Sequence, residues 1–272
     1  MPIWFRWCWL NEDPTIAVEC ITVSLPNREN PCHPEGLTPI QKKLADLLVS
    51  EKTIAKVTRR HGNPGNRTFQ TDEREMGIID FAQEGEFAIK EHDFNPEAPL
   101  SPLYINLRNL PIAISHQIGL AMAQIPEDGL KPEWCVGIPD AGIPLAISYA
   151  TVTGIDYGLA LQKGITTDGK RKIEPYTRHP SYFKGKVRII DDVMSQGHSK
   201  IEAVNALRSI GFEPTDLTIL IDREQGGKAY VERELNILVR SVFTLTQLLD
   251  YYLRTGQVTQ EQYVSVMQYL DT

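Results

Sequence analysis

The spacing of apolar residues becomes regular from about residue 72 onward. Short apolar runs alternate there with longer segments in which apolar residues recur every three or four positions. Strands joined by helices in this way indicate right-handed crossovers, so the pattern predicts an α/β fold with a mainly parallel twisted sheet and helices on both faces. We expect strands at 134–138, 157–161, 187–190, 217–221 and 237–242, and helices at 114–125, 144–154, 200–211 and 245–256.

Residues 1–71 have a different texture, with prolines and asparagines at irregular intervals. One amphipathic helix is expected at 38–57, with apolar positions at Ile40, Leu44, Leu47, Leu48 and Ile54. We interpret 1–71 as an N-terminal extension of unknown role, a partly ordered segment or a packing arm, and 72–272 as the main domain.

Length and charge limit the classes of function. A chain of 272 residues with 42% hydrophobic residues can bury a substantial core. Its formal net charge of -7 argues against a general nucleic-acid-binding surface, which needs clustered Lys and Arg. We find neither an apolar run long enough to span a membrane nor a signal peptide in "MPIWFRWCWLNEDP", and we expect a cytoplasmic protein without a membrane partner.

The four cysteines, at positions 8, 20, 32 and 135, are widely spaced and form no CxxC pair. Cys20, Cys32 and His33 have poor spacing for a metal site. We therefore expect reduced, structurally incidental thiols and no metal held by the protein alone.

The segment "VRIIDDVMSQGHS" at 187–199 carries the clearest chemistry. Asp191 and Asp192 follow an apolar strand, at the sheet edge where α/β proteins bind ligands. A loop of small residues then leads into a helix, whose start we assign to an S-x-x-E capping box formed by Ser199 and Glu202. The free N–H groups at a helix start bind anions, so Ser195, Gly197 and Ser199 suit a phosphate.

A phosphate site beside two carboxylates fits a ligand with a phosphate at one end and hydroxyl groups to donate to the carboxylates. A phosphorylated pentose satisfies this description better than a nucleoside triphosphate, because the sequence lacks GxxxxGK[ST] and no GxGxxG follows the strand. Two alternatives remain open, an acidic pair of the kind found in receiver domains and a solvated loop without a ligand.

The same segment resembles the phosphoribosyl pyrophosphate signature of type I phosphoribosyltransferases, with apolar residues, two acids and a Thr/Ser-x-Gly-x-Thr/Ser loop. "SPLYINLRNLP" at 101–111, "CVGIPDAGIPLA" at 135–146 and the region from 219 to the end are similar to segments of orotate phosphoribosyltransferases. The resemblance extends over about 75–272. It implies the type I phosphoribosyltransferase fold with a small hood region.

The resemblance also implies roles for individual residues. Asp191 and Asp192 would hold the ribose hydroxyls, and the pyrophosphate would lie along Asp140, Ala141 and Gly142. The 5-phosphate loop and its approach would comprise Val193, Met194, Ser195, Gln196, Gly197, His198 and Ser199, and orotate would contact Arg223, Ser195 and Lys90.

Two segments depart from the family pattern. Lys90, in "GEFAIK", lacks the Ser-Gly that follows the corresponding family lysine, and it has the alternative reading of a solvated strand-end lysine. The catalytic loop, RKxxKxxG in the family, is replaced by "LQKGITTDGKRKIEPYTRHPSYFKGK" at 161–186. Lys163 matches one of its basic residues. Lys170, Arg171 and Lys172 either substitute for the others or are solvated.

We therefore expect a phosphoribosyltransferase that converts orotate and phosphoribosyl pyrophosphate to orotidine 5-phosphate and pyrophosphate. Mg²⁺ would accompany the substrate pyrophosphate, and a homodimer is expected because a family loop lysine comes from the partner subunit. The altered loop leaves two alternatives, a non-catalytic phosphoribosyl pyrophosphate sensor and an enzyme that acts on another base.

Overall fold

A computed structural model of the chain describes residues 36–87, 92, 95–166, 169, 171–176, 178 and 184–270. The residues from Gly36 onward belong to one compact unit. At its centre is a five-stranded sheet in the order β11-β10-β9-β5-β6, in which every neighbouring pair is parallel. This confirms the parallel sheet expected from the sequence. The strands are β5 (Trp134–Gly137), β6 (Asp156–Tyr157), β9 (Gly185–Met194), β10 (Phe212–Asp222) and β11 (Leu238–Thr244).

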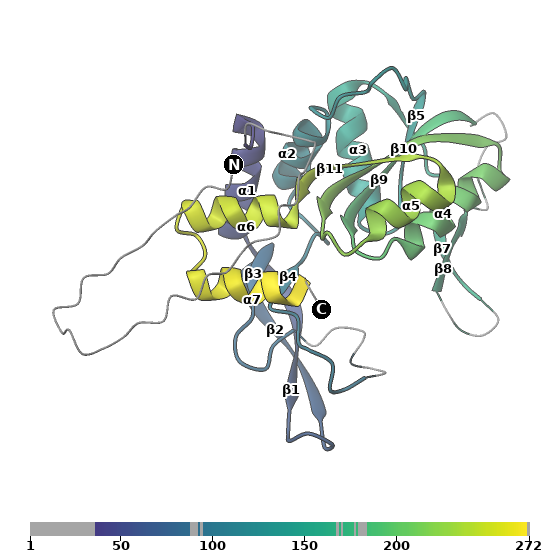
Figure 1. Cartoon of the computed structure of the whole chain (residues 1–272). Coiled ribbons are helices and arrows are strands. Elements are labelled where there is room, and N and C mark those ends of the chain that lie inside the picture. The colour runs from purple at the N-terminus through teal and green to yellow at the C-terminus, as the bar shows by residue number, and fades with distance from the viewer. Residues whose placement is uncertain are drawn as a thin grey trace. The chain divides into compact units, whose positions relative to one another are not determined.

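Helices cover both faces of the sheet (Figure 1), because successive strand residues point to opposite sides. Ile190 contributes to a core with α2 (Ile112–Met122) and α3 (Gly142–Thr153). Its neighbour Ile189 contributes to a second core with α4 (His198–Ser209) and α5 (Gly227–Leu235).

Helix α1 (Pro39–Ser50) belongs to the first of these cores, where it packs with α6 (Leu245–Arg254). The Tyr252 hydroxyl donates to the Ala45 carbonyl at 2.9 Å, and Gln41 Nε2 donates to the Val242 carbonyl at 2.6 Å. The boundary expected at residue 72 therefore moves to residue 36, because the apolar face of α1 completes the core of the main unit. Position 72 itself lies inside strand β2 (Thr68–Gly77).

The helix expected at 38–57 ends earlier, at Ser50. Thr38 and Gln41 form the capping box that begins α1, and Glu51 at its other end is extended. Strand β1 (Lys52–His61) then pairs antiparallel with β2, and Ile54 on it is 65% exposed. The β-branched residues in "KTIAKVT" favour a strand over a continued helix.

Two further short sheets adjoin the main one. Strand β3 (Ile79–Phe81) pairs with β4 (Leu103–Ile105), and β7 (Leu161–Ile165) pairs with β8 (Arg171–Pro175) as a hairpin. The single strand expected at 157–161 is thus divided, since β6 ends at Tyr157 and β7 begins at Leu161. The last described helix is α7 (Gln260–Leu270).

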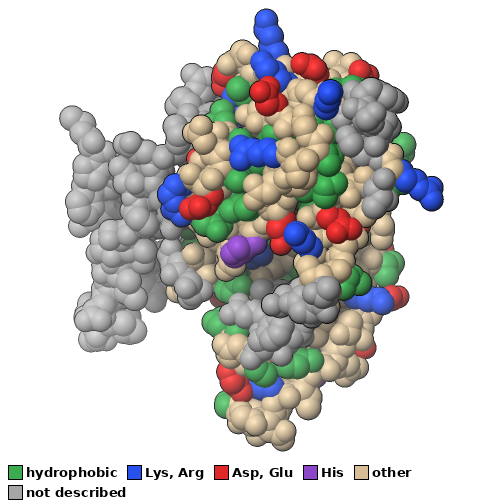
Figure 2. Space-filling view, turned by 90° about the vertical axis from the view of Figure 1, so that its right-hand side faces the viewer, with side chains coloured by type: hydrophobic (Ala, Val, Ile, Leu, Met, Phe, Trp, Pro, Cys, Tyr) green, Lys and Arg blue, Asp and Glu red, His purple; other side chains and the backbone are tan. Residues whose placement is uncertain are grey.

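The surface has mixed charge on the face shown in Figure 2, where acidic and basic side chains interleave among hydrophobic ones. Among the helices in the described ranges, none combines the length and apolar character needed to cross a membrane.

Candidate active site

Strand β9 is longer than the sequence indicated, and it includes the acidic pair. It continues through Asp191 and Asp192 and ends at Met194. Asp191 is buried and forms an ion pair with Lys200, whose Nζ lies 2.7 Å from Asp191 Oδ2. The two carboxylates therefore lie at the carboxyl end of a central strand, which is the expected place for a ligand in a parallel sheet.

The turn after β9 is built around Gly197, which has φ of 86° and caps helix α4. A Cβ at this position would lie 2.7 Å from Val231 Cγ2, so both backbone and packing require glycine. The expected Ser199–Glu202 capping box is absent because Gly197 starts the helix two residues earlier. Glu202 Oε2 instead accepts a hydrogen bond from the Ile173 backbone N–H on β8 at 2.9 Å.

A cavity of about 600 Å³ opens beside this turn. Residues from four separate segments line this cavity. They include the acidic pair, the two serines of the turn and the loop before α3. Half of the phosphoribosyl pyrophosphate residues expected from the sequence, six of twelve, thus meet in one place. The lining includes Asp191, Asp192, Ser195, Ser199, Asp140, Ala141, Lys163, Arg171, Lys172, Lys200, Glu202 and Arg108.

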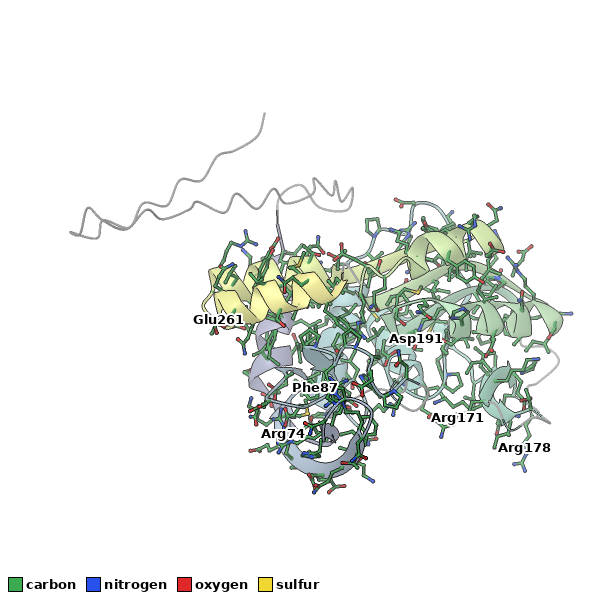
Figure 3. All side chains as sticks on the ribbon, turned by 60° about the horizontal axis from the view of Figure 1, so that its bottom comes forward. Arg74, Phe87, Arg171, Arg178, Asp191 and Glu261 are labelled. Atoms are coloured by element: carbon green, nitrogen blue, oxygen red, sulfur yellow. The ribbon has the colours of Figure 1, made fainter. Side chains whose placement is uncertain are left out.

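The β7–β8 hairpin supplies cations to the cavity. Lys163 on β7 and Arg171 and Lys172 on β8 all line it, and Lys163 Nζ lies 2.6 Å from Asp140 Oδ2. Figure 3 shows Arg171 on the hairpin and Asp191 on the central sheet. Arg171 and Lys172, for which substitution and solvation were both left open, are exposed side chains that line the cavity. Lys170 lies outside the described residues.

The loop between β5 and α3 is closely packed against β9. The peptide bond between Pro139 and Asp140 is cis. The Gly142 N–H donates to the Ile138 carbonyl at 2.9 Å, and a Cβ on Gly142 would lie 2.5 Å from the Ile190 carbonyl oxygen. Gly142 is therefore a packing residue beneath the loop, while Asp140 and Ala141 face the cavity.

A second cavity, of about 220 Å³, shares Arg108 and Asp192 with the first. Arg223 forms part of its wall, and the Nε and Nη2 atoms of this side chain are buried without a hydrogen-bond partner in the described part of the chain. Burial lowers the pKa of the Arg223 guanidinium, and a hydrogen bond with Tyr269 opposes this shift. The group still remains charged, so the wall of this cavity contains a planar cation with two unpartnered nitrogens among the described residues.

Comparison with known proteins points to one family. The chain is 31% identical over 173 residues to the orotate phosphoribosyltransferase of Pyrobaculum islandicum, covering 62% of this chain and 86% of that protein. It is 27% identical over 190 residues to the orotate phosphoribosyltransferase of Caenorhabditis elegans, covering 68% of this chain and 78% of the relative. The chain belongs to the orotate phosphoribosyltransferase family. No protein-family model matches the sequence.

Solved structures agree with this assignment. Leishmania donovani UMP synthase superimposes with a TM-score of 0.55 at 27% identity, over 71% of this chain and 39% of that chain. This orotate phosphoribosyltransferase family member therefore has the expected type I phosphoribosyltransferase fold.

Some of the expected site residues lie away from the two cavities. The Met194 side chain is fully buried in the core on the α4 face. Gln196 and His198 are exposed, and the His198 ring lies 5.9 Å from the Tyr230 ring. Val193 lines the smaller cavity, whereas Ser195 lines the larger one and not the cavity of Arg223. Lys90 lies outside the described residues.

Sequence reasoning missed two cations at the site. Arg108 lines both cavities. It lies in segment 101–111, and the similarity of this segment to the family could have identified it as a site residue. Lys200 directly follows the phosphate loop, but it occupied a position expected to be an ordinary helix start. Its ion pair with Asp191 is visible only in three dimensions.

The two aspartates influence each other electrostatically. Burial and the neighbouring Asp191 carboxylate raise the pKa of Asp192, while the Lys200 ammonium opposes the rise. Among the described residues, no cation forms an ion pair with Asp192. Hydroxyl groups of a ligand would therefore stabilise the ionised form of the acidic pair by donating hydrogen bonds to it.

Proposed function

We propose that this protein transfers the phosphoribosyl group of phosphoribosyl pyrophosphate to orotate, giving orotidine 5-phosphate and pyrophosphate. One observation carries the proposal. Arg223 forms part of the wall of a cavity that shares Asp192 with the larger cavity, and its buried Nε and Nη2 atoms have no hydrogen-bond partner among the described residues. A planar anionic base in the smaller cavity would lie next to a ribose in the larger one.

Orotate suits the smaller cavity because it combines a flat ring with a carboxylate. A guanidinium binds a carboxylate through two parallel hydrogen bonds, and burial strengthens such charge-assisted contacts. A base without an anionic group would leave the Arg223 nitrogens unsatisfied, which costs roughly 1 to 3 kcal/mol or more for a charged group. This difference favours orotate over uncharged pyrimidines and purines.

The larger cavity suits the other substrate. Asp191 and Asp192 accept hydrogen bonds from the ribose hydroxyls, while Ser195, Ser199 and the start of α4 bind the 5-phosphate. These contacts hold the sugar by both ends. Its C1 atom is thereby directed toward the cavity of Arg223.

The protein then has to position the two reactants and stabilise the charges that develop between them. No covalent nucleophile is needed. As the bond from C1 to pyrophosphate breaks, its electron pair leaves with the pyrophosphate and the ring gains positive charge. A ring N–H of orotate forms the new bond to C1 through its nitrogen and gives up its proton, which the departing pyrophosphate can accept. Lys163, Arg171 and Lys172 neutralise the departing anion from the hairpin. Arg108, shared by the two cavities, lies where both reactants meet.

We propose that Mg²⁺ enters with the substrate. In the described part of the chain, no group of three or more His, Cys, Asp or Glu side chains could hold a metal. Mg²⁺ commonly binds through substrate phosphates with few protein ligands, and it would add positive charge at the pyrophosphate.

A homodimer and a cytoplasmic location belong to the same proposal. The family resemblance supports the dimer. The buried free thiol of Cys135 is compatible with a reducing compartment.

The decisive measurement is the loss of orotate absorbance on mixing purified protein with orotate, phosphoribosyl pyrophosphate and Mg²⁺. We expect turnover that disappears in Asp191→Asn/Asp192→Asn. We also expect Arg223→Ala to lower kcat/KM for orotate by at least about 100-fold, since a buried charge-assisted pair is lost. Unchanged kcat/KM in Arg223→Ala would refute the role of Arg223. Binding of phosphoribosyl pyrophosphate without orotate turnover would indicate a sensor or another base.

A further inference from the structure

Lys200 differs from the other cations of the larger cavity in its burial and its partners. Its Nζ lies 2.7 Å from Asp191 Oδ2 and donates a hydrogen bond to the Val193 carbonyl at 2.6 Å. The side chain is 8% exposed, whereas that of Lys163 is 32% exposed. Arg171 and Lys172 are exposed as well. Protein atoms already hold the ammonium of Lys200, so it is not positioned to move with a departing pyrophosphate.

Its partner Asp191 belongs to the acidic pair assigned to the ribose. A carboxylate that accepts hydroxyl hydrogen bonds must be correctly oriented, and the adjacent Asp192 carboxylate repels that of Asp191. The Lys200 ammonium, fixed at 2.7 Å from Asp191, offsets this repulsion. Because Lys200 extends from the first turn of α4, its contacts also tie the phosphate-binding helix to the strand that carries the carboxylates.

We propose that Lys200 is a positioning residue that holds the Asp191 carboxylate in place to accept hydrogen bonds from the ribose hydroxyls. The proposal rests on the proposed function for the identity of the ligand. The cation is part of the chain, so the carboxylate is oriented before any ligand arrives. Affinity for the ribose end of the substrate therefore depends on a residue that does not touch it.

Other charged groups line the same cavity and contribute to the electrostatic potential at Asp191. Asp140 is engaged by Lys163, and Glu202 accepts from the Ile173 backbone. Among the described residues, Lys200 is the cation that forms an ion pair with Asp191. The remaining charged groups of the lining are Asp192, Arg108, Arg171 and Lys172.

The test compares Lys200→Met and Lys200→Gln with the wild-type protein. Lys200→Gln removes the charge and keeps a donor for the Val193 carbonyl, so it remains informative if Lys200→Met does not fold. Lys186→Met is the matched control, because Lys186 is an exposed lysine on the same strand as Asp191, outside both cavities. Two quantities are measured from about pH 5 to pH 9, the Kd of ribose 5-phosphate by calorimetry and kcat/KM for phosphoribosyl pyrophosphate.

We expect the Kd of ribose 5-phosphate to rise about tenfold across this pH range in the Lys200 variants, because the Asp191 carboxylate loses the contact that orients it. At neutral pH, KM for phosphoribosyl pyrophosphate should rise about tenfold while kcat changes less. In an Asp191→Asn background, the effect of Lys200→Gln on ribose 5-phosphate binding should disappear, because Lys200 acts through Asp191. Lys186→Met should leave both profiles unchanged.

Folded Lys200 variants with the wild-type Kd for ribose 5-phosphate would overturn the proposal, and so would an effect that persists in the Asp191→Asn background. Ribose 5-phosphate binding is measured without orotate, so it separates this proposal from the proposed function. A wild-type protein that binds ribose 5-phosphate but does not consume orotate would refute the proposed function and leave this test in force. A wild-type protein that does not bind ribose 5-phosphate would overturn both.

Discussion

Strand β9 carries two buried ion pairs that serve different purposes. Near its start, Arg188 Nη2 lies 2.9 Å from Asp216 Oδ2, with both side chains 0% exposed. Three residues later, Asp191 pairs with Lys200 at 2.7 Å, where the side chains are 6% and 8% exposed. The geometry of the two pairs is alike, but the surroundings differ.

The protein itself supplies several charged and polar partners around the first pair. Arg188 also donates to the Tyr149 hydroxyl, and Arg240 lies 4.0 Å from Asp216 while it pairs with Asp128. At the second pair, Asp192 adds a negative charge without an ion-pair partner in the described part of the chain, and a cavity lies beside it. A pair enclosed by the protein maintains the fold, whereas a pair beside a cavity favours binding of a ligand.

The largest effect is expected at the first pair. Arg188→Met should lower the free energy of unfolding by about 3 to 5 kcal/mol, because it leaves the Asp216 carboxylate buried without its partner. Urea denaturation measures the change. Arg188→Met/Asp216→Leu should recover much of the loss, and the kinetic constants of the folded fraction should stay at wild-type values. A loss below about 1 kcal/mol would mean that the pair is not the structural element described above.

The cavity cations should show the opposite behaviour. Lys163→Gln/Arg171→Gln/Lys172→Gln should lower kcat by at least about 100-fold through weaker stabilisation of the leaving pyrophosphate. The melting temperature should change little, since the hairpin side chains are largely exposed. Lys42→Gln/Lys43→Gln on α1 is the control. An unchanged kcat in the triple variant would place these residues outside the reaction.

Asp192 should lower the stability of the unliganded protein. Its pKa in the folded state lies above that of the unfolded chain because of burial and Asp191, so its ionised form destabilises the fold at high pH. Asp192→Asn should therefore raise the free energy of unfolding at about pH 8 by roughly 1 kcal/mol. The gain should shrink toward about pH 5, where the folded wild-type protein takes up the proton. Denaturation curves at both pH values check this, and destabilisation at pH 8 would contradict it.

The smallest effect is expected at the exposed pair of Asp140 and Lys163. Asp140→Asn releases Lys163 and removes a negative charge from the pyrophosphate cavity. KM for phosphoribosyl pyrophosphate should fall by less than about fivefold, in keeping with the small free energy of exposed ion pairs. A higher KM, measured in the orotate absorbance assay, would show that the Asp140 carboxylate itself contributes to binding.

The sequence predicted the features of the site that depend on local pattern. The apolar strand before Asp191 and the small-residue turn at Gly197 are encoded within 13 neighbouring residues, and the structure contains both. The parallel sheet followed from the alternation of strands and helices for the same reason. Arg223 followed from the family resemblance, and the structure adds that two nitrogens of its guanidinium are buried without a hydrogen-bond partner among the described residues.

The features that the sequence did not reveal depend on contacts between distant segments. Glu202 was expected to cap its own helix, but the hairpin offers it the Ile173 N–H, 29 residues away. Lys200 was not recognised because its partner lies on another element. Helix α1 was assigned to an extension because its apolar face gives no sign of the C-terminal helix that covers it.

The pairing of α1 with α6 has a consequence for how the chain folds during synthesis. Gln41 and Ala45 bond to partners 201 and 207 residues further along the chain. At a synthesis rate of about 5 to 20 residues per second, this separation corresponds to roughly 10 to 40 seconds. Helix α2 covers part of the apolar face of α1 early in synthesis, but the part that contacts β11 and α6 stays uncovered on the ribosome throughout that interval. The docking of α6 on α1 is therefore a late step, and truncation before α6 would leave this part of the apolar face exposed.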